Sequence, residues 1–125
     1  MSLLSMACLA EGQELFQLSN SGQQQRYLDV DSVKRLEDEQ VDFAIRQISS
    51  RGYRPATASE RVAISATEYV VDCRRNRWKS VKIRYITDEG KDVGHADVPA
   101  PDRTWNDIAP GGELETVRNK LCATG

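Results

Sequence analysis

Hydrophobic residues alternate with polar or small residues in several short stretches of this chain. Residues 41–46 place Val41, Phe43 and Ile45 on one side of an extended chain, which predicts a half-buried strand. Further strands are predicted at 15–18, 26–30, 61–72, 78–86 and 91–98. The last three are joined by turn sequences too short to cross over a sheet, so these strands are expected to form an antiparallel meander.

Two other segments interrupt this pattern. Residues 31–35 are predicted to form a turn or a single helical turn that Asp31 caps. Residues 49–59 contain Gly52, Pro55 and several serines or threonines, and are predicted to form the longest loop. Long surface loops often carry function, so this loop is a candidate for contact with a partner.

The pattern changes to a helical period near the C-terminus. Residues 113–122 place Leu114, Val117 and Leu121 on one apolar stripe. Ten residues are marginally helical on their own in water, so this helix needs a sheet to pack against. We therefore predict an α+β fold, with an antiparallel sheet of about 5–6 strands and a C-terminal helix packed on it.

The three cysteines bear on how that helix is held. Cys73 ends the strongest predicted strand and Cys122 ends the helix, so a disulfide between them would pin the helix to the sheet. The closed loop would stabilise the fold by roughly 4 kcal/mol through chain entropy. The alternative is two buried free thiols. Cys8 is left over as a free thiol, an intermolecular bridge or a residue outside the mature protein.

The first ten residues are expected to lie outside the folded domain. Residues 3–10 are apolar and end in small residues, like the end of a secretory signal that is cut after Ala10. We interpret 1–10 as a signal-peptide remnant or a cloning scar, and 11–125 as a single domain. The alternatives are an ordinary N-terminal helix or strand, or a lipoprotein signal at Cys8, for which Ser5 and Met6 fit poorly. Export would place the chain in the periplasm or at the cell surface, associated with the outer membrane, where disulfides form.

The composition of the chain argues against several classes of function. The chain has 125 residues, 39% of them hydrophobic, and a net charge of -2, which argues against general binding to nucleic acid. No apolar run approaches the ~18 residues of a transmembrane segment. With His95 as the only histidine and no Cys-x-x-Cys motif, no metal or cofactor is predicted.

Catalytic groups are also sparse, and no enzyme is predicted. His95 near Asp97 lacks a nucleophile motif and is interpreted as an exposed edge-strand histidine. Asp29 and Asp31 share a strand face, the minimum for acid and base catalysis, but turn capping and solvation explain them more simply.

A basic and aromatic run around the turn before residue 78 is the strongest candidate for binding. Its members are Arg74, Arg75, Arg77, Trp78, Lys82 and Arg84. Strict alternation puts Trp78, Lys82 and Arg84 on one strand face. The opposite face would then carry Val81, Ile83 and Tyr85. Such a face could hold an acidic partner; alternatively, Trp78 packs under the helix while the arginines solvate a hairpin tip.

Several segments together resemble the surface-adhesin protein E family of Gram-negative bacteria. They are residues 27–33, residues 69–73 with the Asp72-Cys73 pair, Tyr85, residues 105–112 and Cys122. The resemblance covers about residues 15–122. It implies an exported antiparallel sheet backed by a C-terminal helix, with a disulfide that maps to Cys73 and Cys122. It also implies a surface protein that binds host matrix and serum proteins and forms a homodimer.

Two functions follow as hypotheses. The first is an exported cell-envelope binding module, adhesin-like, that recognises a protein partner or an acidic polymer through the basic and aromatic sheet face. The second is a periplasmic inhibitor of an enzyme such as lysozyme, with the 49–59 loop inserted into the enzyme's cleft.

Overall fold

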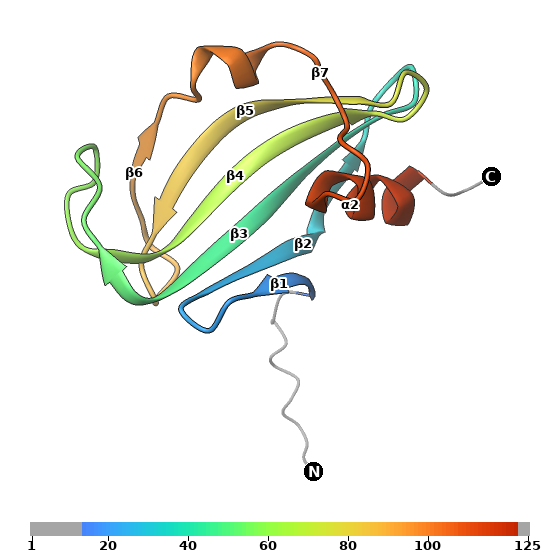
Figure 1. Ribbon diagram of the computed structural model, residues 1–125. Helices are drawn as coiled ribbons and strands as arrows, with labels where there is room; N and C mark the ends of the chain where they lie inside the picture. Colours follow the sequence, from blue (N-terminus) through green and yellow to red (C-terminus); the bar gives the residue numbers. More distant parts are fainter. Residues whose placement is uncertain (1–13, 123–125) are drawn as a thin grey trace.

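The computed structural model describes residues 14–122 and consists of one curved antiparallel sheet with a single α-helix (Figure 1). The strands are β1 (Leu15–Asn20), β2 (Gln24–Arg35), β3 (Gln40–Tyr53), β4 (Val62–Asp72), β5 (Arg77–Ile86), β6 (Asp92–Ala96) and β7 (Asn106–Asp107). Strands β1 to β6 lie side by side in sequence order, each hydrogen-bonded to its neighbours, and β7 pairs with β5. The predicted α+β class and antiparallel meander are confirmed.

The main core lies between the sheet and helix α2 (Glu113–Cys122). Val41, Phe43 and Ile45 of β3 are all buried, as their alternation predicts. They meet Val117 and Leu121 of α2, whose helical bounds match the sequence prediction. Burial of one face of the sheet against one stripe of the helix is what holds this short helix in place.

Helix α2 is fixed at both ends as well as by its apolar stripe. At its C-terminus Cys122 is bonded to Cys73, with their Cα atoms 5.7 Å apart, which confirms the predicted disulfide. The Arg35 guanidinium donates to the carbonyl of Leu121 at 2.9 Å. At its N-terminus Glu113 accepts two hydrogen bonds from Arg26 of β2, at 2.7 and 2.9 Å. The helix therefore has a defined position on the sheet.

Strand β2 is longer than predicted, because no turn forms at residues 31–35. Pairing with β3 steps from Asp29↔Ala44 to Lys34↔Asp42, so extra β2 residues bulge out of the ladder. At this bulge the Ala44 amide donates to the Ser32 hydroxyl at 2.8 Å in place of a backbone carbonyl of β2. A side chain thus replaces the missing backbone partner, and the strand continues.

The predicted loop at 49–59 is also partly wrong. Strand β3 runs on to Tyr53, and the connection to β4 covers only residues 54–61. Gly52 makes this extension possible, because its φ of +69° is a conformation that glycine adopts readily. The segment proposed for insertion into an enzyme is therefore shorter than the sequence indicates.

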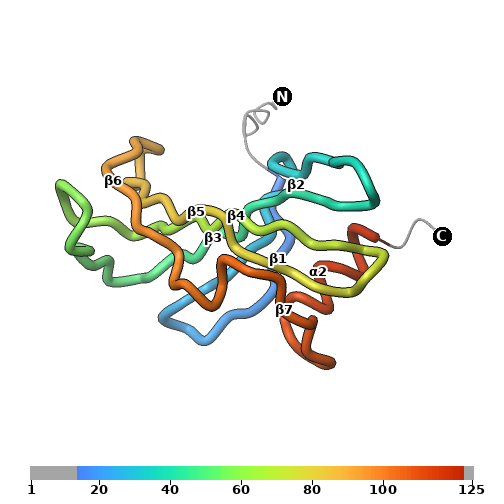
Figure 2. The backbone as a smooth tube through the Cα atoms, turned by 90° about the horizontal axis from the view of Figure 1, so that it is seen from above, coloured from blue at the N-terminus to red at the C-terminus, as the bar shows by residue number. Residues whose placement is uncertain are grey.

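The C-terminal part of the chain crosses the whole sheet. Figure 2 shows it running from β6 at one end, through the short 3-10 helix η1 (Ala100–Arg103) and β7, to α2 at the other end. Val98 and Ile108 are buried along this path. Within residues 14–122, no helix is long and apolar enough to cross a membrane.

Candidate binding surface on strand β5

A β-bulge at Val81 decides which side chains of β5 share a face. Glu68 pairs with Lys82 while Tyr69 pairs with Ser80, so Val81 is an extra residue opposite the β4 ladder. Its side chain is 48% exposed and does not join the core. A single inserted residue exchanges the two faces of a strand, because side chains alternate with a period of two.

Trp78 therefore does not share a face with Lys82 and Arg84, and that prediction is wrong. Trp78 pairs with Val71, packs against the main core and meets the ring of Tyr69 edge-on, with centroids 5.9 Å apart. This agrees with the alternative in which Trp78 packs under the helix. Trp78 is a core residue that is only partly accessible.

The bulge instead gathers the cations of β5 on the face away from α2. We call this row the β5 cationic face; it consists of Arg77, Lys79, Lys82 and Arg84. Their partners on β4 are, in the same order, Asp72, Val70, Glu68 and Ala66, which alternate along one face. Without the bulge, the first two would point the opposite way from the last two.

Trp105 provides the aromatic group that Trp78 does not. Its ring centroid lies 4.6 Å from the Arg77 Cζ and 4.7 Å from the Lys79 Nζ. The next residue, Asn106, begins strand β7, which pairs with the start of β5 and so holds the indole beside these cations. Sequence reasoning placed Trp105 in the family pattern but not in the site. The signal was a tryptophan in a short segment between prolines, whose partner strand is not predictable from local sequence.

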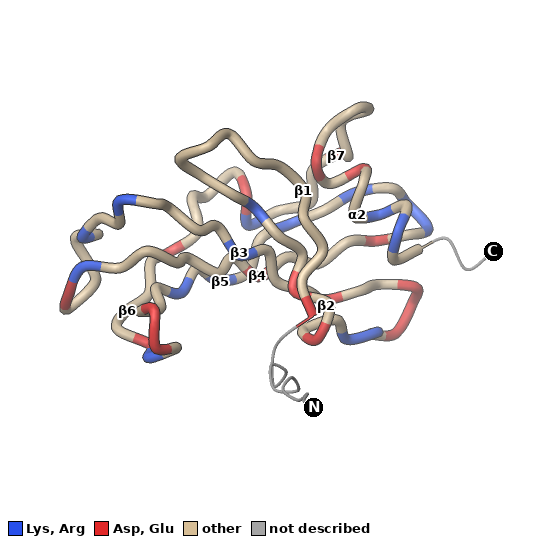
Figure 3. Tube along the Cα trace, turned by 90° about the horizontal axis from the view of Figure 1, so that it is seen from below, with Lys and Arg blue, Asp and Glu red and all other residues tan. Residues whose placement is uncertain are grey.

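The arginines at the β4–β5 turn are largely occupied by internal partners. Arg74 and Arg75 contact Asp38 of the β2–β3 turn at 3.0 and 3.4 Å. Figure 3 shows these basic and acidic turns at the same end of the molecule. Because both arginines are about half exposed, these ion pairs are screened by solvent.

The β4–β5 turn is held by the buried side chain of Asp72. Its carboxylate is fully buried and accepts hydrogen bonds from the backbone amides of Arg74 and Arg75, both at 3.1 Å. The side chains of Arg75 and Arg77 also contact it, both at 3.3 Å. Burial alone would raise the pKa of Asp72, but these hydrogen bonds outweigh burial and lower it. Asp72 therefore stays ionised and fixes the turn.

Lys82 and Arg84, the half of the β5 cationic face farther from the β4–β5 turn, have fewer partners within the protein. Arg84 contacts Asp92 of β6 at 3.5 Å. Lys82 is exposed and makes no ion pair or side-chain hydrogen bond with any residue in 14–122. Next to it, Asp42 and Glu68 line a hollow of about 190 Å³ together with Lys34 and Arg84. Burial and a hydrogen bond with Glu68 raise the pKa of Asp42 to about 6, against a smaller opposing effect of Lys34.

Other candidate groups are not brought together. His95 is exposed on edge strand β6, opposite Arg84, the position expected for it from the sequence. Asp31 does not cap a turn, and its carboxylate accepts from the Glu14 amide at 3.0 Å. Asp29 is buried and pairs with Arg46 at 3.1 Å. Among residues 14–122, no group of His, Cys, Asp or Glu side chains is arranged to hold a metal ion.

Comparison with known proteins agrees with this architecture. A family model described as surface-adhesin protein E matches residues 14–123. The chain belongs to the surface-adhesin protein E family. The match covers all of the described residues and confirms the family resemblance seen in the sequence. Residues 1–10, where the signal remnant was predicted, lie outside both this match and the described residues.

The fold also has a counterpart among solved structures. Protein E of Haemophilus influenzae matches with a TM-score of 0.62 and 15% sequence identity, over 79% of each chain. At this identity the likeness establishes a shared fold, and adhesin E membership comes from the family match. No curated protein sequence matches the chain.

Proposed function

We propose that this member of the surface-adhesin protein E family is an exported, adhesin-like binding module that holds an acidic surface of a partner protein. The contact surface is the β5 cationic face with Trp105. The single observation that carries the proposal is the bulge at Val81, which lines up four cations on one strand face. Family membership supports the adhesin-like role and the location outside the cytoplasm.

The composition of this face suits protein recognition. Arginine and tryptophan are enriched at the centres of protein interfaces, where Trp105 and Arg77 would serve as anchors. Charged residues around such a centre steer an oppositely charged partner and set its orientation. Lys82 is free to pair with a carboxylate of the partner without breaking an ion pair within the described part of the chain.

Export is supported by the disulfide. A bond between Cys73 and Cys122 forms and persists in an oxidising compartment such as the periplasm or the cell surface. Cleavage after Ala10 and a homodimer stay predictions, and mass spectrometry of the native protein tests both.

The experiment is capture by a panel of purified extracellular-matrix and serum proteins, with three forms of the chain. Lys82→Glu reverses a cation on the proposed face, and Arg54→Glu makes the same charge change in the exposed β3–β4 connection. We expect Lys82→Glu to weaken capture about tenfold at low salt, and Arg54→Glu to have little effect. Equal loss in both variants, or no loss in either, contradicts the proposal. Soluble heparin serves as a competitor, and direct retention of the chain by heparin alone would point to an acidic polymer instead.

A further inference from the structure

A second hollow lies between the start of β2 and the end of β3 and has a volume of about 300 Å³. Its lining residues include Gln23, Gln24, Gln47, Ser49 and Tyr53. It shares no residue with the β5 cationic face, so it is separate from the surface proposed above.

Strand pairing sets the positions of these polar groups. Gln24 and Ser49 are direct partners across β2 and β3. The Ser50 amide donates to the Gln23 carbonyl at 2.9 Å, which fixes the β1–β2 turn against the end of β3. Gln47 uses its Oε1 to accept from Arg26 at 2.8 Å, so its amide nitrogen remains a donor for a ligand.

Tyr53 stands at the rim of this hollow as an exposed aromatic group. It is 37% exposed and meets Tyr85 edge-on, with ring centroids 6.4 Å apart. Tyr85 in turn packs against the smaller core of Ala58, Val62 and Val93. The Tyr53 ring is therefore supported from within the protein while part of its surface faces solvent.

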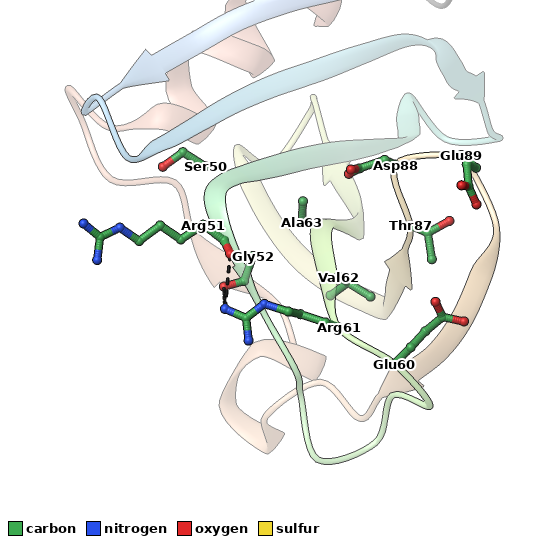
Figure 4. Close-up of a pocket in the computed structure, with 10 residues that line it drawn as sticks. All are labelled: Ser50, Arg51, Gly52, Glu60, Arg61, Val62, Ala63, Thr87, Asp88 and Glu89. Carbon is green, nitrogen blue, oxygen red and sulfur yellow. Dashed lines mark hydrogen bonds between the residues drawn. The ribbon is translucent and has the colours of Figure 1, made fainter.

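The backbone before Tyr53 is held in a specific bend. Gly52 has a φ of +69°, and a side chain there would meet the Val62 carbonyl at 3.1 Å. Figure 4 shows the Arg61 guanidinium reaching back to this bend, where it donates to the carbonyls of Arg51 and Gly52 at 3.2 and 3.1 Å. Arg61 lies in the neighbouring hollow and fixes the bend from that side. The bend at Gly52 and its hydrogen bonds with Arg61 therefore fix the position of the Tyr53 backbone.

We propose that this hollow binds a neutral oligosaccharide. Glutamine amides and serine hydroxyls both donate and accept hydrogen bonds, as each sugar hydroxyl requires. The tyrosine ring offers a flat apolar platform with a polar tip, which matches the mixed faces of a pyranose ring. Arg51 is the only formally charged side chain among the lining residues, so the hollow is poorly suited to a highly charged ligand. A few placed polar groups beside an aromatic ring are typical of small-ligand sites.

The test is a titration of the ¹⁵N-labelled chain, followed by amide chemical shifts. The probes are neutral hexasaccharides of glucose and N-acetylglucosamine, with sulfated and sialylated oligosaccharides as comparisons. We expect saturable shifts at Gln24, Ser49 and Tyr53 with a neutral probe, and a Kd of about 1 mM. Absence of saturable shifts with every neutral probe at ~10 mM, or tighter binding of sulfated probes, overturns the proposal.

Variants separate this site from the cationic face. Tyr53→Ala should weaken binding of the neutral probe about fivefold, and Tyr53→Trp should retain it because the aromatic platform remains. Phe16→Ala is the matched control, because Phe16 on β1 is 38% exposed, nearly the same exposed fraction as that of Tyr53. Lys82→Glu should leave sugar binding unchanged, whatever it does to protein capture. Unchanged binding in Tyr53→Ala also overturns the proposal.

Discussion

Arg77 and Trp105 lie against each other, with the Arg77 Cζ 4.6 Å from the centroid of the indole ring. They are far apart in sequence and meet because β7 pairs with the start of β5. Arg77 simultaneously contacts the buried Asp72 at 3.3 Å. The position of this aromatic group therefore depends on the β5–β7 pairing and on the turn that Asp72 holds.

Deletion of Val81 should destabilise the protein strongly. Without the extra residue, β5 can keep either Trp78 in the core or Lys82 and Arg84 on the outer face, but not both. Loss of the Trp78 packing predicts a fall of about 3 kcal/mol in the free energy of unfolding, measured by urea denaturation. Val81→Ser keeps the bulge and changes only an exposed side chain, so it should cost less than about 0.5 kcal/mol. Similar losses in the two variants would contradict this role of the bulge.

Removal of the disulfide should loosen the helix from the sheet. Replacing both Cys73 and Cys122 with alanine is expected to lower the free energy of unfolding by about 4 kcal/mol, because the unfolded chain regains its freedom. Reduction of the wild-type protein by dithiothreitol should lower its Tm to a similar value. A variant as stable as the oxidised wild type would show that α2 is held by its apolar stripe and its ion pair alone.

Asp72→Asn should destabilise the β4–β5 turn in a pH-dependent way. The pKa of Asp72 is lowered in the folded protein, so its contribution is present above the unfolded value of about 3.9 and is lost as the pH falls through the folded pKa. At pH 7 we expect the Tm to fall by about 5–10 °C. The gap between variant and wild type should narrow as the pH falls below 4. A Tm difference that stays constant with pH would contradict the ionised state assigned to Asp72.

The Asp42 and Glu68 pair should have the opposite pH dependence. Because the pKa of Asp42 is raised to about 6, the folded state binds a proton more tightly than the unfolded state does. Stability is therefore greatest below the unfolded value and falls as the pH rises through 6. Asp42→Asn should stabilise the protein at pH 7.5 by about 1 kcal/mol, allowing for solvent screening, and have little effect at pH 4. Urea denaturation at both pH values measures this, and a variant less stable than wild type at pH 7.5 would contradict it.

Local sequence patterns predicted the parts of the fold that depend on burial. The alternation around Phe43 and the helical spacing of Val117 and Leu121 identified the elements that enclose the core. Cys73 directly follows β4 and Cys122 ends α2, so the disulfide was predictable from the ends of these two elements. These features are encoded along short stretches, because the core needs apolar groups with the period of each element.

The candidate surface was less accessible from sequence. The bulge at Val81 arises from the way β4 and β5 pair, and an alternating pattern contains no sign of it. Ser32 likewise replaces a backbone partner only because Ala44 lies opposite. The approach of Trp105 to Lys79 requires the chain to cross the sheet first. Each of these relationships depends on which residues lie opposite one another after folding, and local sequence does not show this.

The most direct test of the proposed binding surface maps the contact on the ¹⁵N-labelled chain. A partner protein identified by capture is added, and the amides whose signals shift or broaden are assigned. We predict that the affected residues centre on Lys79, Lys82 and Trp105, and that the shifts disappear in Lys82→Glu. Perturbations confined to α2 or to the hollow beside Tyr53, with the β5 amides unchanged, would show that the cationic face is not the binding surface.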